Sequence, residues 1–314
     1  MKKITPTKSV THPISSKIIA GLRKTNSRKV VDISELRDAK INAENLEKTI
    51  ITEKQLSRLD PLHGVYIYAQ NKLSVIIEEI SALPALTKLA DAYENAEDVY
   101  MPSGPPMSPL TKSYFTCWGF LDLCVGLNKE SFGTIAIDIC RFLKADPDLI
   151  TIFERMQKSR MGFYVHEGVS GKLVNLREII TQEKIQAIVP SGYLGEPGEI
   201  WFARLMPEPF PQLNYGYSIV FITPYIITEI QNNSLVFASE EKWEAFFERS
   251  REKTKIEDKK RSYQFLMKYG LNRHYWNEYI IDAYTSNTND MILLTGFPDI
   301  PLSMPHSREN SDRF

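Results

Sequence analysis

In the first half of the chain, the apolar positions repeat with the period of an α-helix. Apolar residues recur every three or four positions between residues 62 and 80, which predicts an amphipathic helix. Residues 110–125 are apolar or aromatic on nearly all sides of a helix, as expected for a helix at the centre of a core. Asn128 and Asp146-Pro147 favour the starts of two further helices, since Asn caps helix N-termini and Pro suits the first turn.

After residue 160 the pattern changes to short segments with strand-like alternation. Apolar and polar residues alternate from 162 to 169, and Ser170-Gly171 is a hairpin signal before the chain returns over 172–176. Further short strands are predicted at residues 185–189, 199–205, 217–223 and 235–237. Several short strands joined mainly by tight turns predict a small antiparallel β-barrel, closed or nearly closed.

A tight turn at Pro197-Gly198 forms the centre of this β-rich stretch. The pair suits a type II turn, because proline fixes φ and glycine supplies the positive φ that the next position needs. The chain runs from this turn directly into a predicted strand. Helical periodicity resumes at Ser239, a good N-cap, and continues through a segment with charges of both signs to Gly270.

The predicted fold class is α+β, with a largely helical body, an inserted small antiparallel β-barrel-like module and a C-terminal helical segment. The predicted organisation is a basic flexible arm (1–33), a helical domain (34–160), the β-module (161–238), a C-terminal helical segment that packs on the body (239–296) and a flexible tail (297–314). One short strand is expected within the C-terminal segment, at residues 291–294.

Charge is distributed unevenly along a chain whose net charge is only −1. Residues 1–31 contain eight Lys or Arg residues and no acidic residue before Asp32, so the remainder is acidic. The simplest interpretation is a solvated, flexible N-terminus. An arm that binds nucleic acid or a membrane surface is the main alternative. A transit peptide is a third interpretation, although its basic residues are mostly Lys where transit peptides favour Arg.

The cysteines indicate a reducing compartment. Cys117, Cys124 and Cys140 lie in apolar segments, and their spacing matches no zinc motif, so we predict buried free thiols. No apolar run reaches the roughly 18–20 residues of a transmembrane helix. The first residues lack the hydrophobic core of a secretory signal. The sequence therefore predicts a cytoplasmic protein without a membrane partner.

Most recognisable catalytic motifs are missing. The five histidines are far apart and none stands in a metal-binding motif; they are His12, His63, His166, His274 and His306. Neither a phosphate-binding glycine loop nor a Gly-x-Ser-x-Gly elbow occurs. No metal and no other cofactor is predicted.

A short part of the β-rich stretch resembles a known module. The tract Leu176-Arg177-Glu178 precedes a Pro-Gly-acid-aliphatic turn and a strand that ends in Ala203-Arg204-Leu205. This arrangement is similar to a β-module of poorly characterised bacterial proteins, some of which carry a C-terminal SEC-C zinc motif. The cysteines of that zinc motif are absent here, and the resemblance implies no assigned activity.

The first functional hypothesis is a non-catalytic bacterial protein that binds another protein or a nucleic acid. Small barrels often bind peptides or single-stranded nucleic acid through exposed aromatic side chains. The candidate binding residues are Tyr164, Tyr193, Trp201, Arg204 and Tyr217, with Tyr215 nearby. The basic arm would assist nucleic-acid binding. The proline-rich segment 102–109 is either a rigid connector or a loop that lines a groove.

The alternative hypothesis is a divalent-metal-dependent phosphodiester hydrolase. Such an enzyme needs two or three converging carboxylates and usually a lysine. The candidates on the β-module are Glu178, Glu196 and Glu199 with Lys184. A second candidate is the pair His274 and Glu278, which would share one face of a helix and could perform acid–base chemistry. Each of these residues also has a structural interpretation, as a turn, edge or surface-pair side chain.

Overall fold

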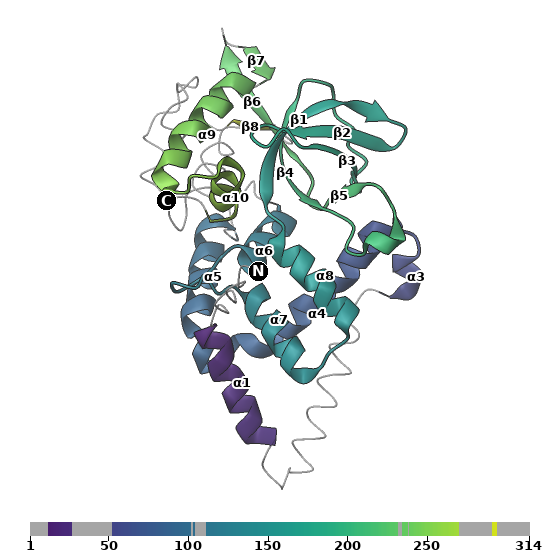
Figure 1. Ribbon diagram of the computed structural model, residues 1–314. Helices are drawn as coiled ribbons and strands as arrows, with labels where there is room; N and C mark the ends of the chain where they lie inside the picture. The colour runs from purple at the N-terminus through teal and green to yellow at the C-terminus, as the bar shows by residue number, and fades with distance from the viewer. Residues whose placement is uncertain are drawn as a thin grey trace, which may run out of the picture.

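The computed structural model describes residues 12–26, 52–101, 103, 111–231, 234–237, 239–269 and 291–293. A helical body carries a β-barrel at one end, and two further helices pack against one side of the barrel (Figure 1). The predicted α+β class, with a small barrel module between helical segments, is confirmed.

The helices at 61–81, 112–121, 132–143 and 147–158 lie in the segments predicted to be helical. The full set of described body helices includes others and consists of α1 (Pro13–Asn26), α3 (Glu53–Leu56), α4 (Pro61–Ser81), the 3-10 turn η1 (Pro84–Leu86), α5 (Thr87–Tyr100), α6 (Lys112–Leu121), α7 (Phe132–Leu143) and α8 (Pro147–Lys158). Asp146 caps α8 with Pro147 in its first turn, as predicted. The cap of α7 is Ser131 rather than Asn128, because Ser131 and Thr134 satisfy each other's backbone N–H groups in a capping box.

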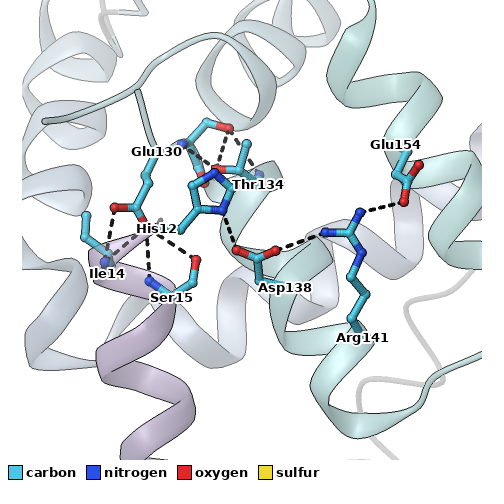
Figure 2. Close-up of polar contacts among 9 residues, drawn as sticks. His12, Ile14, Ser15, Glu130, Thr134, Asp138, Arg141 and Glu154 are labelled. Carbon is cyan, nitrogen blue, oxygen red and sulfur yellow. Dashed lines mark hydrogen bonds and ion pairs between the residues drawn. The ribbon is translucent and has the colours of Figure 1, made fainter. Parts of the chain in front are cut away.

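The N-terminal helix α1 is docked on the body. The backbone N–H groups of Ile14 and Ser15 donate to the buried carboxylate of Glu130, each over 3.1 Å. His12 Nδ1 lies 2.6 Å from a carboxylate oxygen of Asp138, on α7 (Figure 2). A carboxylate at a helix N-terminus also complements the helix dipole. The prediction of a flexible arm is therefore wrong for residues 12–26, and the rest of the arm lies outside the described residues.

The barrel is built from five strands that close on themselves. They are β1 (Met161–Ser170), β2 (Leu173–Glu178), β3 (Lys184–Ile188), β4 (Ile200–Met206) and β5 (Ser218–Val220). Strands β1, β2 and β3 form an antiparallel meander, and β4 returns to pair with β1. The spatial order β4-β1-β2-β3 is a Greek key. Strand β5 closes the ring between β3 and β4. The pairing is antiparallel as predicted, except that β3 and β5 run parallel.

The strand β6 (Tyr225–Gln231) extends the sheet beyond the barrel and was not predicted. It pairs with residues 200–202 of β4, whereas β5 pairs with residues 205–206 of the same strand. Of the strand expected at 217–223, residues 218–220 pair as β5, and the chain re-enters the sheet only after Pro224. Strands β7 (Ser234–Phe237) and β8 (Met291–Leu293) pair with β6, and β8 coincides with the strand expected at 291–294.

Strand β4 is buried on both of its faces. Trp201 points into the barrel, whereas the neighbouring Phe202 points outward and packs on Phe163. The outer face of this part of the barrel is covered by α9 (Glu240–Thr254) and α10 (Lys259–Tyr269). Trp243 and Phe247 of α9 contact the ring of Phe163, and the hydroxyl of Tyr263 in α10 accepts the N–H of Phe163. Burial on both faces explains the nearly continuous apolar run in β4.

The turn before β4 has the predicted geometry. Gly198 has φ of +98°, and the N–H of Glu199 donates to the carbonyl of Glu196 over 3.2 Å. This is the backbone of a type II turn with proline and glycine at its centre. The charged helix expected to run from Ser239 to Gly270 is interrupted at Lys255, which has φ of +58° and separates α9 from α10.

A buried charge cluster joins the barrel, the body and α10. Arg204 of β4 donates to the carboxylate of Asp122, which follows α6, and to the carbonyl and hydroxyl oxygens of Ser159. Lys268 of α10 lies 2.7 Å from the other oxygen of Asp122 and donates to the carbonyls of Gln157 and Ser159, at the C-terminal end of α8. One carboxylate therefore neutralises cations from two elements that are distant in sequence.

Replacement of Asp122 by Asn should lower the unfolding free energy by about 3–5 kcal/mol, because two buried cations then lack a counter-charge. The control is Glu154→Gln, which breaks the solvent-exposed pair with Arg141 and should cost less than about 1 kcal/mol. Chemical denaturation measures both losses. Equal losses would contradict the assignment of Asp122 as the buried counter-ion.

Lys268 should give the wild type a distinctive alkaline stability profile. Burial lowers the pKa of Lys268 to about 8, against the opposing effect of Asp122. Between pH 8 and the ordinary value of 10.5 the unfolded chain binds more protons than the folded chain, so this group makes the unfolding free energy rise with pH. The unfolding free energy of the wild type should therefore rise relative to that of Lys268→Met by up to about 3 kcal/mol as the pH is raised from about 8 to 10.5. The tyrosines titrate in both proteins and cancel, whereas Cys117 and Cys124 interact electrostatically with Lys268, so that interaction forms part of the measured difference. A difference that stays constant with pH would refute the prediction.

Candidate functional site

Two of the predicted binding aromatics are part of the barrel interior. Trp201 is 0% exposed and Tyr164 is 4% exposed, so neither ring can stack on a ligand. Trp201 Nε1 and the hydroxyl of Tyr193 both donate to the buried carboxylate of Glu199, each over 2.7 Å. Burial raises the pKa of Tyr164, and the neighbouring Glu178 raises it further. The expectation that Tyr164 and Trp201 form a binding surface is wrong, because they fill the barrel.

Arg204 is also removed from the candidate binding residues. Its side chain is fully buried and engaged with Asp122 and Ser159 in the charge cluster. Tyr193 and Tyr217 are both half-buried. The ring of Tyr193 packs on the cluster that fills the barrel, with its centroid 5.7 Å from that of Trp201, whereas Tyr217 lies outside that cluster.

The carboxylates proposed for a hydrolase lie in separate environments. Glu178 is buried and receives two hydrogen bonds from Arg160, over 2.6 and 3.1 Å. Glu199 is bound to Trp201 inside the barrel, whereas Glu196 is exposed at the turn. Within the described part of the chain, no group of three or more His, Cys, Asp or Glu residues could hold a metal ion.

The remaining candidate residues of the hydrolase hypothesis do not join these carboxylates in a site. Lys184 is 73% exposed on the outer face of the barrel and pairs with Glu167. His274 and Glu278 lie outside the described residues. The described carboxylates thus have structural partners or stand alone, and no catalytic constellation forms from them.

A polar row crosses the outer face of strands β2 and β3. Alternation places Val174 and Leu176 inside the barrel and Asn175 outside, where it lies opposite Gln186 of β3. Gln186 Nε2 donates to Asn175 Oδ1 over 2.9 Å, and Asn175 Nδ2 donates to the hydroxyl of Ser170 over 3.0 Å. This face therefore presents amide groups to solvent on two adjacent strands.

Tyr215 and Tyr217 lie in the segment just before β5. The parallel ladder begins with Ser218 opposite Ala187, so the same direction leads back toward Tyr217 on one chain and Gln186 on the other. The rings of Tyr215 and Tyr217 have centroids 5.8 Å apart; both are half-buried and pack against the core shared with the helical body. We call these two tyrosines and the two amides the amide–tyrosine row: Asn175, Gln186, Tyr215 and Tyr217.

The helical body fixes Tyr217. Its hydroxyl donates to Asp60 over 2.8 Å. Burial, followed by this hydrogen bond, raises the pKa of Tyr217 to about 12, so the hydroxyl remains a donor throughout the neutral range. The N–H of Tyr215 donates to Glu208 over 2.7 Å. The orientation of the ring pair is therefore set within the folded protein.

Cationic side chains flank the amide–tyrosine row. Two residues further along β2 and β3 from Asn175 and Gln186, Arg177 and Lys184 form the next pair of outward-facing residues, and both contact Glu167. Arg177 also binds Glu240 of α9. Lys172 is exposed at the tip of the β1–β2 hairpin, and within the described residues no carboxylate forms an ion pair with it. Lys172 and Lys184 are the cations on this surface with the greatest freedom to contact a ligand.

Comparisons with protein-family models, curated proteins and solved structures found no match to this chain. The resemblance of the 176–205 tract to the bacterial β-module therefore stays a prediction. No helix in the described ranges is long and apolar enough to cross a lipid bilayer.

Sequence reasoning missed most of the amide–tyrosine row. Asn175 and Gln186 are ordinary polar positions in two predicted strands, and only their register brings them together. Nothing in the sequence indicated that β5 would lie parallel to β3, which is what brings Tyr217 next to Gln186.

Proposed function

We propose that this protein binds single-stranded nucleic acid, without catalysis, on the amide–tyrosine row of its barrel. The observation that carries the proposal is the adjacency of two partly exposed tyrosine rings and two outward amides on one polar barrel face. Bases stack on aromatic rings regardless of sequence, and amides can hydrogen-bond to base edges. Lys172 and Lys184 would contact phosphates.

The topology of the barrel supports the same surface. Five-stranded Greek-key barrels of the OB type bind oligonucleotides on the face of strands 2 and 3, between the loops that join strands 1 to 2 and strands 4 to 5. Here those loops are the β1–β2 hairpin and residues 207–217. They lie at one end of the barrel, since Leu173 pairs with Ile188 and Ile188 pairs with Ile219. The similarity of topology concerns the fold alone. The stacking rings and amide groups of the amide–tyrosine row supply the chemistry for binding.

The position of the covering helices favours this face over the rest of the barrel. Helices α9 and α10 cover the β1–β4 side, where Phe163 and Phe202 are buried. Helix α1 lies at the end of the body opposite the barrel (Figure 1). The basic residues within α1 are therefore far from the proposed ligand, so the described part of the arm adds nothing to this site.

A reducing, cytoplasmic location forms part of the proposal. Its support is that Cys117, Cys124 and Cys140 are all free thiols, two of them buried. Burial raises the pKa of Cys117 to about 11, which disfavours the reactive thiolate.

Removal of either tyrosine ring should weaken binding of an oligothymidylate. Tyr215→Ala and Tyr217→Ala should each raise the Kd by roughly 5-fold to 150-fold, because stacking contributes about 1–3 kcal/mol per base. The control is Tyr68→Ala, an exposed tyrosine of α4 in the body, which should bind as the wild type does. Fluorescence anisotropy of a labelled oligonucleotide measures the three affinities. If wild-type protein binds no oligonucleotide but captures a polypeptide partner, the nucleic-acid proposal fails.

Lys172 and Lys184 should set the salt dependence of binding. Each phosphate contact on a single strand contributes about 0.7 to the slope of log Kd against log salt concentration. Lys172→Ala combined with Lys184→Ala should therefore lower the slope by about 1.4 if each lysine contacts one phosphate. Lys88→Ala, at an exposed position of α5, should leave the slope unchanged. An unchanged slope in the double variant would show that the ligand's phosphates lie elsewhere.

A further inference from the structure

The carboxylate of Asp60 performs two tasks with its two oxygens. Oδ1 accepts the N–H groups of Leu62 and His63, over 2.9 and 3.3 Å, and thereby caps helix α4. Oδ2 accepts the hydroxyl of Tyr217 over 2.8 Å. The N-terminus of a body helix is thus bonded directly to a side chain of the amide–tyrosine row.

The same helix holds the other end of the loop that carries the tyrosines. The hydroxyl of the buried Tyr66, on α4, donates to the carbonyl of Pro207. The ring of Tyr66 also meets Phe221 edge-on, with centroids 5.9 Å apart. Residues 207–217 therefore start and end at contacts with α4. Between these contacts, Glu208 accepts the N–H of Tyr215, so the loop is fixed internally as well.

We infer that Asp60 is a positioning residue for ligand binding, which holds the ring of Tyr217 in the orientation required for stacking. This inference rests on the proposed function. A half-buried tyrosine without its hydroxyl contact would have to be ordered when the ligand binds, and the immobilisation of one such side chain weakens affinity by about twofold to tenfold. Asp60 would not touch the ligand and would act only through Tyr217.

The helix cap and the tyrosine contact can be separated by substitution. Asp60→Ser keeps a residue that is favoured as an N-cap, but its side chain is too short to reach Tyr217. Tyr217→Phe removes the hydroxyl and keeps the stacking ring. Asp60→Asn keeps the cap and can offer its amide N–H to the tyrosine oxygen, so it serves as the conservative rescue.

The experiment measures oligothymidylate affinity by anisotropy for the wild type, the three single variants and the Asp60→Ser/Tyr217→Phe double variant. We expect Asp60→Ser and Tyr217→Phe each to raise the Kd by about twofold to tenfold. The double variant should be no weaker than either single variant, because both remove the same contact. Asp60→Asn should bind more tightly than Asp60→Ser. The salt slope should not change in any variant, because no phosphate contact is lost.

The outcomes separate this inference from the proposed function. Wild-type protein that fails to bind the oligonucleotide refutes the proposed function. Wild-type protein that binds, together with Asp60→Ser or Tyr217→Phe at wild-type affinity, refutes the inference alone. Additive losses in the double variant would also refute it. If Asp60→Ser unfolds, Tyr217→Phe and Asp60→Asn still carry the test, because neither removes the helix cap.

Discussion

The architecture depends on the buried carboxylate of Asp122. It lies between Arg204 of the barrel and Lys268 of α10, and the same two cations hold the backbone carbonyls and hydroxyl at the end of α8. A buried cation is tolerated only beside a counter-charge, so these elements must meet at this point if the chain is to fold. This requirement fixes which side of the barrel faces the helices. As a consequence, the β2–β3 face is left toward solvent.

Most of the aromatic and acidic side chains that the sequence suggests as functional have structural roles in the barrel. Trp201 and Glu199 form a buried hydrogen bond at one end of the barrel, and Glu178 is neutralised by Arg160. These groups fill and close the barrel. The polar side chains that remain available stand on alternate positions of two short strands, with two tyrosines supplied by a loop that the helical body holds in place. The proposed ligand surface is thus a product of strand register and of a helix cap rather than of any motif.

The sequence predicted local features better than long-range ones. The hairpin at Gly171, the type II turn at Gly198 and the start of α8 depend on neighbouring residues, and all three were predicted. The docking of α1 depends on Glu130 and Asp138, more than 100 residues away, and was not predictable from the arm itself. The prediction that Trp201 binds a ligand is wrong, because the sequence of an apolar strand does not show whether one face or both faces of the strand are buried. The same sequence features favour Tyr217 as favour the buried Trp201, so only the fold separates the two residues.

Photochemical cross-linking would locate the bound single strand on the surface of the protein. A photoreactive single-stranded oligonucleotide is irradiated in complex with the full chain, and the attached peptides are identified by mass spectrometry. If the single strand binds on the amide–tyrosine row, cross-links form to the segment with Tyr215 and Tyr217 and to the outer positions of β2 and β3. Cross-links confined to the N-terminal residues or to the helical body, or none at concentrations that saturate binding, would show that the ligand does not bind there.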